Sequence, residues 1–181
     1  MNIVYYEGDR IYFRPVELED EPLVRQWIND PQVWRTLCHH GPLNACRERE
    51  WIENQGKSEA DYVFGIVVRE ADRLIGTAGL HQVHRVNRSA TFGIALAADG
   101  QNQGYGSEAT RLVVRYGFEQ LNLNRIALRV YASNARAIRV YEKAGFAVEG
   151  RCRQEVFING RYEDVLYYAI LREQWAAMAA A

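Results

Sequence analysis

The sequence has little cysteine and no cysteine pair. Its three cysteines, Cys38, Cys46 and Cys152, are scattered, and no two of them form a Cys-x-x-Cys motif. An odd, scattered set does not build a disulfide framework or a zinc site, and it suits a reducing compartment. We therefore expect packing thiols, no metal and a cytoplasmic protein.

Long apolar runs and an excess of one charge are also absent. No stretch approaches the roughly 20 apolar residues that span a bilayer, and the N-terminus lacks the basic start and apolar core of a signal peptide. Lys and Arg number 22 against 23 Asp and Glu, so the net charge is -1. This balance predicts neither a membrane nor a nucleic-acid partner.

What is present is enough apolar sequence for one substantial core. The chain has 181 residues, of which 48% are hydrophobic, and this predicts a single domain over 1–181. No repeat, linker or low-complexity segment divides it. The Ala-rich end after about residue 175 is expected to fray.

Hydrophobic periodicity and turn residues predict alternating strands and helices. Strands are expected at 10–14, 62–69, 74–81, 90–96, 125–131, 146–156 and 161–171. Helices are expected from about 20 to 28, as one turn at 33–37, and at 45–55, 108–121 and 135–144.

Local signals set several of these ends. Asn44 and Asn134 are placed to cap helices, and Gly56 and Gly145 are placed to close them. Asn159-Gly160 between two apolar runs predicts a hairpin. The side chains expected on the buried face of the first helix are Leu23, Trp27 and Ile28.

Three glycines, Gly100, Gly104 and Gly106, stand in a polar loop between an expected strand and an expected helix. Glycine allows a positive φ and a close approach of the backbone to a ligand, and the start of a helix attracts phosphate. No Lys-Ser/Thr pair follows, and the spacing is not that of a dinucleotide fingerprint. The loop predicts an anion cradle, with an ordinary turn before a helix as the alternative.

The spacing Gln101-x-x-Gly104-x-Gly106 resembles the pyrophosphate loop of GNAT-type acyl-CoA N-acyltransferases. The stretch from Asn134 through Tyr141 to Gly145-Phe146 resembles the other half of that family's signature. The segments 13–20, 116–123 and 157–161 resemble the branch that holds spermidine and ribosomal-protein N-terminal acetyltransferases.

The resemblance implies an α+β fold. We expect a mixed, mostly antiparallel sheet of six or seven strands, helices on both faces, and two central parallel strands, 90–96 and 125–131, that splay apart. The implied co-substrate is acetyl-CoA, whose pantetheine arm would pair with the backbone of Ile94, Ala95 and Leu96. The other residues implied to bind it are Gln101, Asn102, Gln103, Gly104, Tyr105, Gly106, Ser107, Asn134, Arg136, Ala137 and Lys143.

The resemblance also places Tyr141 at the leaving thiolate of CoA, where a neutral phenol can donate a proton. As an alternative, Tyr141 is a core aromatic beside Ile138 and Val140. Asn134 and Ser107 have an alternative role as helix caps.

Acyl transfer needs a neutral amine, and free alkylamines have a pKa near 10.4, so a base is required. Many relatives carry a Glu where this chain has Thr91, which is a poor base. The remaining candidates are His81, His84, Glu155 or a chain of waters, and each side chain has an ordinary structural role as its alternative. No base is assigned from the sequence.

The predicted function is transfer of an acetyl group from acetyl-CoA to a primary amine of a small molecule or a protein N-terminus. A polyamine acceptor needs a pocket lined by carboxylates. The segment 33–44, which would wall the acceptor site, holds Arg35, His39 and His40 and no carboxylate, and this disfavours spermidine. Two roles are open for the tryptophans Trp27, Trp34 and Trp51. They are expected either to form an apolar wall of the acceptor site or to pack in the core. A non-catalytic CoA-binding module of the same fold and a homo-oligomer stay open.

Overall fold

The computed structural model describes residues 3–37, 41–158 and 160–179. Its helices and strands in chain order are β1 (Tyr6–Glu7), β2 (Ile11–Arg14), η1 (Leu18–Asp20), α1 (Glu21–Ile28), α2 (Pro31–Trp34), α3 (Ala45–Lys57), β3 (Tyr62–Val68), β4 (Arg73–His84), β5 (Ser89–Leu96), η2 (Ala98–Gly100), α4 (Tyr105–Glu119), β6 (Arg125–Tyr131), α5 (Ala135–Lys143), β7 (Ala147–Ile158), β8 (Arg161–Leu171) and α6 (Arg172–Ala179).

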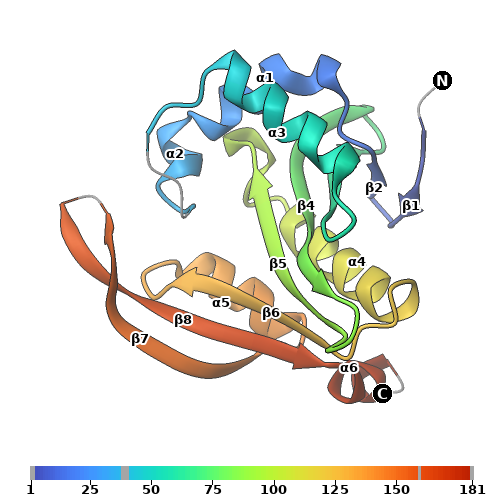
Figure 1. Cartoon of the computed structure of the whole chain (residues 1–181), viewed down its shortest axis with the longest axis vertical. Helices are drawn as coiled ribbons and strands as arrows, with labels where there is room; N and C mark the ends of the chain where they lie inside the picture. The colour runs from blue at the N-terminus through green and yellow to red at the C-terminus, as the bar shows by residue number, and fades with distance from the viewer. Residues whose placement is uncertain (1–2, 38–40, 159, 180–181) are drawn as a thin grey trace.

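The strands form one eight-stranded sheet in the order β1-β2-β3-β4-β5-β6-β8-β7 (Figure 1). Every neighbouring pair is antiparallel except β5 and β6, which are parallel. The α+β class and the mixed, mostly antiparallel sheet are confirmed. The strand beyond the expected six or seven is β1, whose two residues are too few to show a period in the sequence.

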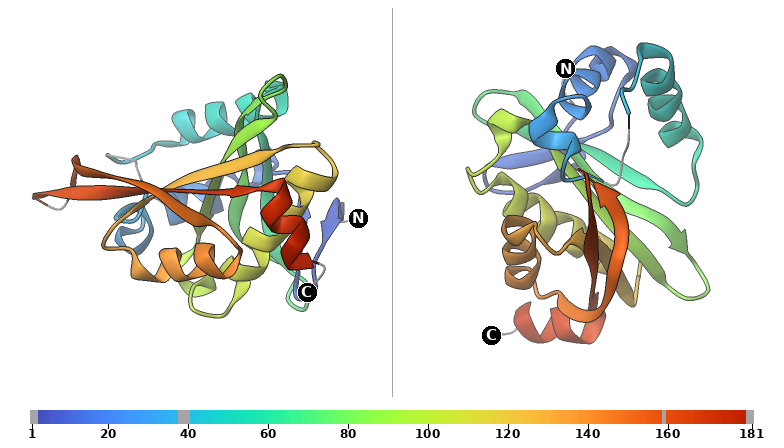
Figure 2. Two further views of the ribbon diagram at one scale, coloured as in Figure 1. Left: turned by 90° about the horizontal axis from the view of Figure 1, so that it is seen from below. Right: turned by 90° about the vertical axis from the view of Figure 1, so that its left-hand side faces the viewer.

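Helices cover both faces of this sheet, as the left view of Figure 2 shows for α3 on one side and α4 and α5 on the other. Because side chains alternate along a strand, neighbouring residues of β2 enter different cores. Ile11 and Phe13 join the large core under α4 and α5. Tyr12 joins a smaller core with Val24 and Trp27 of α1.

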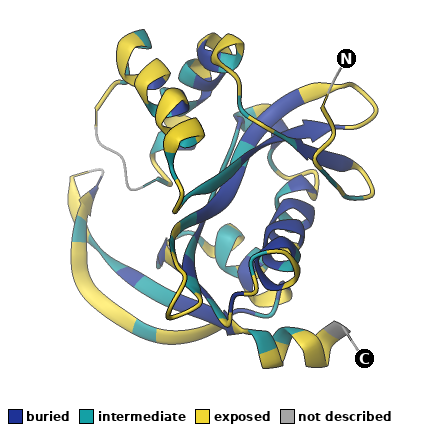
Figure 3. Ribbon diagram, turned by 45° about the vertical axis from the view of Figure 1, so that its right-hand side comes forward, coloured by how far each residue is buried: buried dark blue, intermediate teal, exposed yellow. Residues whose placement is uncertain are grey.

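Helix α4 is the most buried helix, and its inner face is dark blue in Figure 3. Gly117 lets it lie close to the sheet. A Cβ added at Gly117 would stand 2.8 Å from Ile126 Cδ1 and 2.9 Å from Leu80 Cδ1. The helix that follows the glycine loop is therefore fixed against the central strands.

The expected buried face of the first helix is wrong at Leu23, which is 37% exposed. A 3-10 turn, η1, precedes α1, and the buried positions of α1 are Glu21, Val24 and Trp27. A glutamate therefore occupies an inward position at which periodicity alone predicts an apolar residue.

Several expected ends also shift. α3 continues through Gly56 to Lys57, and β4 runs past His81 to His84. α4 begins at Tyr105 rather than at Glu108. Instead of a frayed tail, α6 follows β8, and its Trp175 ring lies 5.3 Å from that of Phe118.

The expected caps at Asn44 and Asn134 and the helix end at Gly145 are confirmed, whereas Gly56 does not end α3. Asn44 accepts a hydrogen bond from the Arg47 amide, and Asn134 accepts one from the Ala137 amide. Gly145 closes α5 with a φ of +95°. Asn159 of the expected hairpin turn lies outside the described residues, as do Cys38, His39 and His40. No helix in the described ranges is long and apolar enough to cross a membrane.

Glu108 joins α4 to the edge of the sheet. It is 8% exposed, and its Oε1 accepts hydrogen bonds from the amides of Arg10 (2.8 Å) and Ile11 (3.2 Å). Glu108→Ala leaves these amides without their acceptor, so we expect a loss of about 1–3 kcal/mol in unfolding free energy. Glu108→Gln keeps an oxygen acceptor and should lose less in the same urea titration. Equal stability of the two variants would contradict this role.

Candidate functional site

The glycine loop ends in an uncapped helix start. Gly104 is the N-cap of α4 with a φ of +88°, and no side chain caps the helix. Within the described residues, the amides of Tyr105 and Gly106 donate to no acceptor. Free amides at the positive end of a helix dipole form a site for an anion.

The loop is held in place from both sides. Gln101 Nε2 donates to the Leu96 carbonyl (3.0 Å), and Arg10 Nη1 donates to the Gln103 carbonyl (2.8 Å). The Arg10 guanidinium also lies 4.4 Å from the centre of the Tyr105 ring. The loop is thus tied to β5 and to the turn before β2.

Beside the loop, the two parallel strands part. β5 and β6 pair only from Ser89 to Thr91 and from Arg125 to Ala127, and Figure 1 shows their arrows diverging beyond this point. β4 pairs with the other edge of β5 as far as Leu96. Among the described residues, no strand therefore pairs with the edge of β5 that faces β6 at Ile94–Leu96.

A cavity of about 270 Å³ lies at this divergence. The predicted site residues that line it are Ile94, Ala95, Leu96, Gln101, Asn102, Gly104, Gly106, Ser107, Asn134, Arg136, Ala137 and Tyr141. The sequence analysis missed the lining residues Val33, Thr36, Leu37, Thr110 and Val140. Thr36 and Leu37 come from the turn after α2, which nothing local in the sequence assigns to this place.

Three predicted residues do not line this cavity. The Tyr105 side chain is 9% exposed and packs in the core. Gln103 donates from Nε2 to the Asp99 carbonyl. Lys143 lines a separate hollow beside α4 and α6. The structure therefore does not bring these three side chains to the divergence of the strands.

Tyr141 lines the first cavity and is 9% exposed. Its ring lies edge-on to Phe92 (5.9 Å between centroids) and Phe146 (6.1 Å). Its hydroxyl makes no hydrogen bond to the described residues. Burial raises the pKa of Tyr141 to about 12, so the phenol is protonated at neutral pH and can donate.

Asn134 and Arg136 line the α5 side of the same cavity. Asn134 Oδ1 caps α5 through the Ala137 amide (3.1 Å), which leaves its NH₂ group free to donate to a ligand. The exposed Arg136 donates to Asn102 Oδ1 at 3.4 Å, across from the helix to the loop. The Arg136 guanidinium thus supplies a positive charge to the first cavity, beside the glycine loop whose free amides form the anion site.

A second cavity, of about 330 Å³, lies on the opposite face of β4 and β5. Its floor is made of small side chains, because Thr77 pairs with Ala95 and Gly79 pairs with Gly93. Trp27 of α1 and Trp51 of α3 line it as well, whereas Trp34 does not. Both cavities are lined by Val33, Leu37 and Ile94–Leu96, so they meet at the end of β5.

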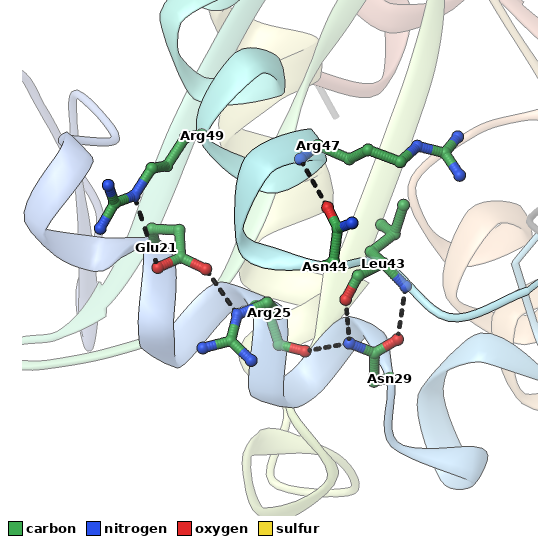
Figure 4. Close-up of polar contacts among 7 residues, drawn as sticks. All are labelled: Glu21, Arg25, Asn29, Leu43, Asn44, Arg47 and Arg49. Carbon is green, nitrogen blue, oxygen red and sulfur yellow. Dashed lines mark hydrogen bonds and ion pairs between the residues drawn. The ribbon is translucent and has the colours of Figure 1, made fainter.

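Polar contacts fix α1 and α3 over this second cavity (Figure 4). The Asn29 side chain donates to and accepts from the backbone of Leu43, with both distances 2.9 Å. Glu21 forms ion pairs with Arg25 (2.5 Å) and Arg49 (3.9 Å). These contacts tie α1 to α3 and to the segment that leads into it.

Glu48 of α3 is a lining residue that the sequence analysis missed. It is 3% exposed, and its carboxylate forms no hydrogen bond or ion pair with the described residues. Burial raises the pKa of Glu48, the Glu21 carboxylate raises it further, and Arg25 opposes the shift. The available signal was its position four residues before Ile52, on the buried face of α3.

The three candidate bases have different surroundings. The carboxylate of Glu155 accepts from Tyr167 (2.8 Å) and pairs with Arg129. His84 is exposed, and its Nδ1 accepts from the Asn87 amide at 3.0 Å. Of the three, only His81 lines either cavity, and it stands directly opposite Thr91 in the β4–β5 register.

The described residues contain no group of three or more His, Cys, Asp or Glu side chains that could hold a metal ion. The polar groups that line the two cavities are instead amides, hydroxyls, one guanidinium, one phenol, one imidazole and one buried carboxylate.

Comparison with known proteins gives a consistent result. Residues 10–147 match the model of the acetyltransferase (GNAT) domain. The probable N-acetyltransferase YjcK of Bacillus subtilis is 37% identical over 91% of this chain and 96% of its own length. The spermidine N(1)-acetyltransferase of Escherichia coli K12 is 31% identical over 92% and 89%.

A solved structure shares the fold. The spermidine N-acetyltransferase from Vibrio cholerae, in complex with CoA and spermine, superposes with a TM-score of 0.82 and 29% identity over 93% of this chain and 99% of that one. The chain belongs to the GNAT acetyltransferase family and is an acyl-CoA-dependent N-acetyltransferase.

Proposed function

We propose that this enzyme moves an acetyl group from acetyl-CoA to a primary amine of a small molecule or a protein N-terminus. The observation that carries the proposal is the meeting of two cavities at the end of β5. A donor in the first cavity and an amine in the second would approach each other at Ile94–Leu96.

The donor is proposed to lie along the loop and the open strand edge. The amides of Tyr105 and Gly106 would bind the CoA pyrophosphate, and the exposed Arg136 would add charge at the mouth. The pantetheine arm would pair like a strand with the unpaired edge of Ile94–Leu96. Asn134 would donate its NH₂ group to a pantetheine carbonyl.

The chemistry divides between the two cavities. The neutral amine attacks the thioester carbonyl, which a backbone N–H of the open edge would polarise. The C–N bond forms and the C–S bond breaks. Tyr141, protonated and facing the first cavity, would give its proton to the CoA thiolate.

The acceptor is proposed to carry one positive charge. Among the described residues that line the second cavity, Glu48 is the one carboxylate, and it lies with Trp27 and Trp51. Aromatic rings and one buried carboxylate suit a single ammonium group on an apolar body. Spermidine, the substrate named for two of the relatives, is the alternative acceptor. A cytoplasmic location and self-association remain predictions.

The first prediction tests the anion site. Gly104→Val places a branched side chain at a φ of +88° beside the proposed phosphate position. The valine side chain should keep the pyrophosphate from the amides of Tyr105 and Gly106, and a charge-assisted hydrogen bond is worth about 1.5–3 kcal/mol. CoA binding measured by calorimetry should therefore weaken roughly 10–100-fold. The matched control is Gly160→Val, with a φ of +78° and open space around it, which should leave CoA affinity unchanged. Wild-type affinity in Gly104→Val would remove the pyrophosphate from this loop.

The second prediction concerns Tyr141. Tyr141→Phe keeps the ring contacts with Phe92 and Phe146, so melting temperature and CoA affinity should change little. Losing a positioned acid should lower kcat about 10²–10⁴-fold.

Tyr168 supplies the control for Tyr141. It is 4% exposed and bonded to Glu142, but it lines neither cavity, so Tyr168→Phe should keep its kcat. Near-normal kcat in Tyr141→Phe would refute the acid role, and a large fall in its melting temperature would support a core aromatic instead.

The third prediction concerns the acceptor. In a panel read by release of CoA thiol, spermidine should not exceed apolar monoamines or N-terminal peptides in kcat/KM. Glu48→Gln should raise the amine KM roughly 10–100-fold, as expected for a lost charged hydrogen bond, without changing CoA affinity. A wide preference for spermidine would favour the polyamine alternative. Absence of thiol release with every amine, despite CoA binding, would favour a non-catalytic module.

A further inference from the structure

Strand β4 contains an irregularity built around Asp61. The register with β5 shifts between His81 and His84, and Gln82 has a φ of +54°. Asp61 Oδ1 accepts a hydrogen bond from the Gln82 amide (3.1 Å), and Oδ2 accepts one from Ser58 Oγ (2.7 Å). Bulges of this kind redirect the neighbouring side chain, which here is His81.

The same carboxylate orients the imidazole. His81 Nδ1 lies 3.4 Å from Asp61 Oδ1. Burial alone would raise the pKa of Asp61, but hydrogen bonds from Ser58 and Gln82 and the contact with His81 lower it. An ionised Asp61 is an acceptor only, so it favours the tautomer with the proton on Nδ1 and leaves the lone pair on Nε2.

Nε2 is directed over β5 at Gly93. A Cβ added at Gly93 would stand 3.2 Å from His81 Nε2 and 3.3 Å from Cδ2. The missing side chain thus makes room for the ring on the floor of the second cavity. Gly93 adjoins Ile94, where the two cavities meet.

We propose that His81 is the general base of this enzyme and that Asp61 is its positioning residue. The inference rests on the proposed function, because the second cavity must hold the acceptor amine. An ammonium R–NH₃⁺ becomes an amide with one N–H, so two protons leave nitrogen. His81 Nε2 takes one and releases it to water. Tyr141 gives its own proton to the CoA thiolate. The second proton from the amine nitrogen then reaches the Tyr141 oxygen through water and restores the phenol.

The charged groups facing His81 come from few elements. Asp61 precedes β3, and Glu48 of α3 is the other titratable residue that lines the second cavity among the described residues. β5 supplies the uncharged Thr91 and Gly93, and α1 supplies Val24, Trp27 and Ile28. Both ionisable neighbours are carboxylates, so Glu48 is the competing base.

The test compares pH profiles of kcat/KM for wild type, His81→Gln, Asp61→Asn and Glu48→Gln. His81→Gln should lower kcat about 10²–10⁴-fold and remove the rise of kcat/KM with pH that marks the base, with CoA affinity and melting temperature unchanged. Asp61→Asn keeps an oxygen for the Gln82 amide, so it should lower kcat and shift that rise without raising the amine KM. Free imidazole should partly restore kcat in His81→Ala.

The matched control is His84→Gln, three residues further along β4 and exposed, which should keep wild-type kcat and profile. A normal profile in His81→Gln, or its loss in Glu48→Gln instead, would overturn the proposal. Either result leaves the proposed function intact as long as wild type releases thiol from acetyl-CoA with an amine. Failure of wild type itself would refute the proposed function.

Discussion

The parting of β5 from β6 is the constraint on which the rest of this molecule depends. Peptide groups away from water need hydrogen-bond partners, yet beyond Thr91 the inner edge of β5 has none from β6. The separation persists because each strand is held from outside. β4 pairs with β5 up to Leu96, and β8 pairs with β6 over its whole length. The open edge is thereby a fixed feature of the sheet.

The helices then define what can reach that edge. α4 starts at the glycine loop beside β5, and Gly117 fixes it tightly against Leu80 and Ile126. On the opposite face, the clamp from Asn29 to Leu43 holds α1 and α3 together over a floor of small residues. Both cavities are therefore bounded by helices around the end of one strand.

The sequence predicted the parts of this arrangement that have local causes. Strand β6 occupies the predicted range 125–131. Asn134 caps α5 because its side-chain oxygen accepts a hydrogen bond from the Ala137 amide, three residues further along the chain. The glycine loop supplies Gln101, Asn102, Gly104, Gly106 and Ser107 to the lining of the first cavity, and the family resemblance pointed to the predicted lining residues on β5 and α5.

What the sequence could not predict depends on contacts between distant segments. Glu48 lies in a strongly charged helix, so its spacing from Ile52 puts it on the buried face but does not show which cavity its carboxylate enters. The bulge at Gln82 depends on Asp61, which is 21 residues away in the chain. Similarly, Leu37 belongs to the segment 33–44 that was expected at the acceptor site, but it also lines the first cavity because the turn after α2 lies against the end of β5.

The alternation of side chains along β5 has a consequence for how such an enzyme can diverge. Phe92 packs on Tyr141 and Ala90 lies in the same core, whereas Thr91 and Gly93 face the opposite layer with His81. A substitution at an odd position, together with its partner on β4, changes the second cavity and leaves the packing around Tyr141 intact. One strand thus carries two separable surfaces, so that lineages can exchange one surface while they inherit the other unchanged.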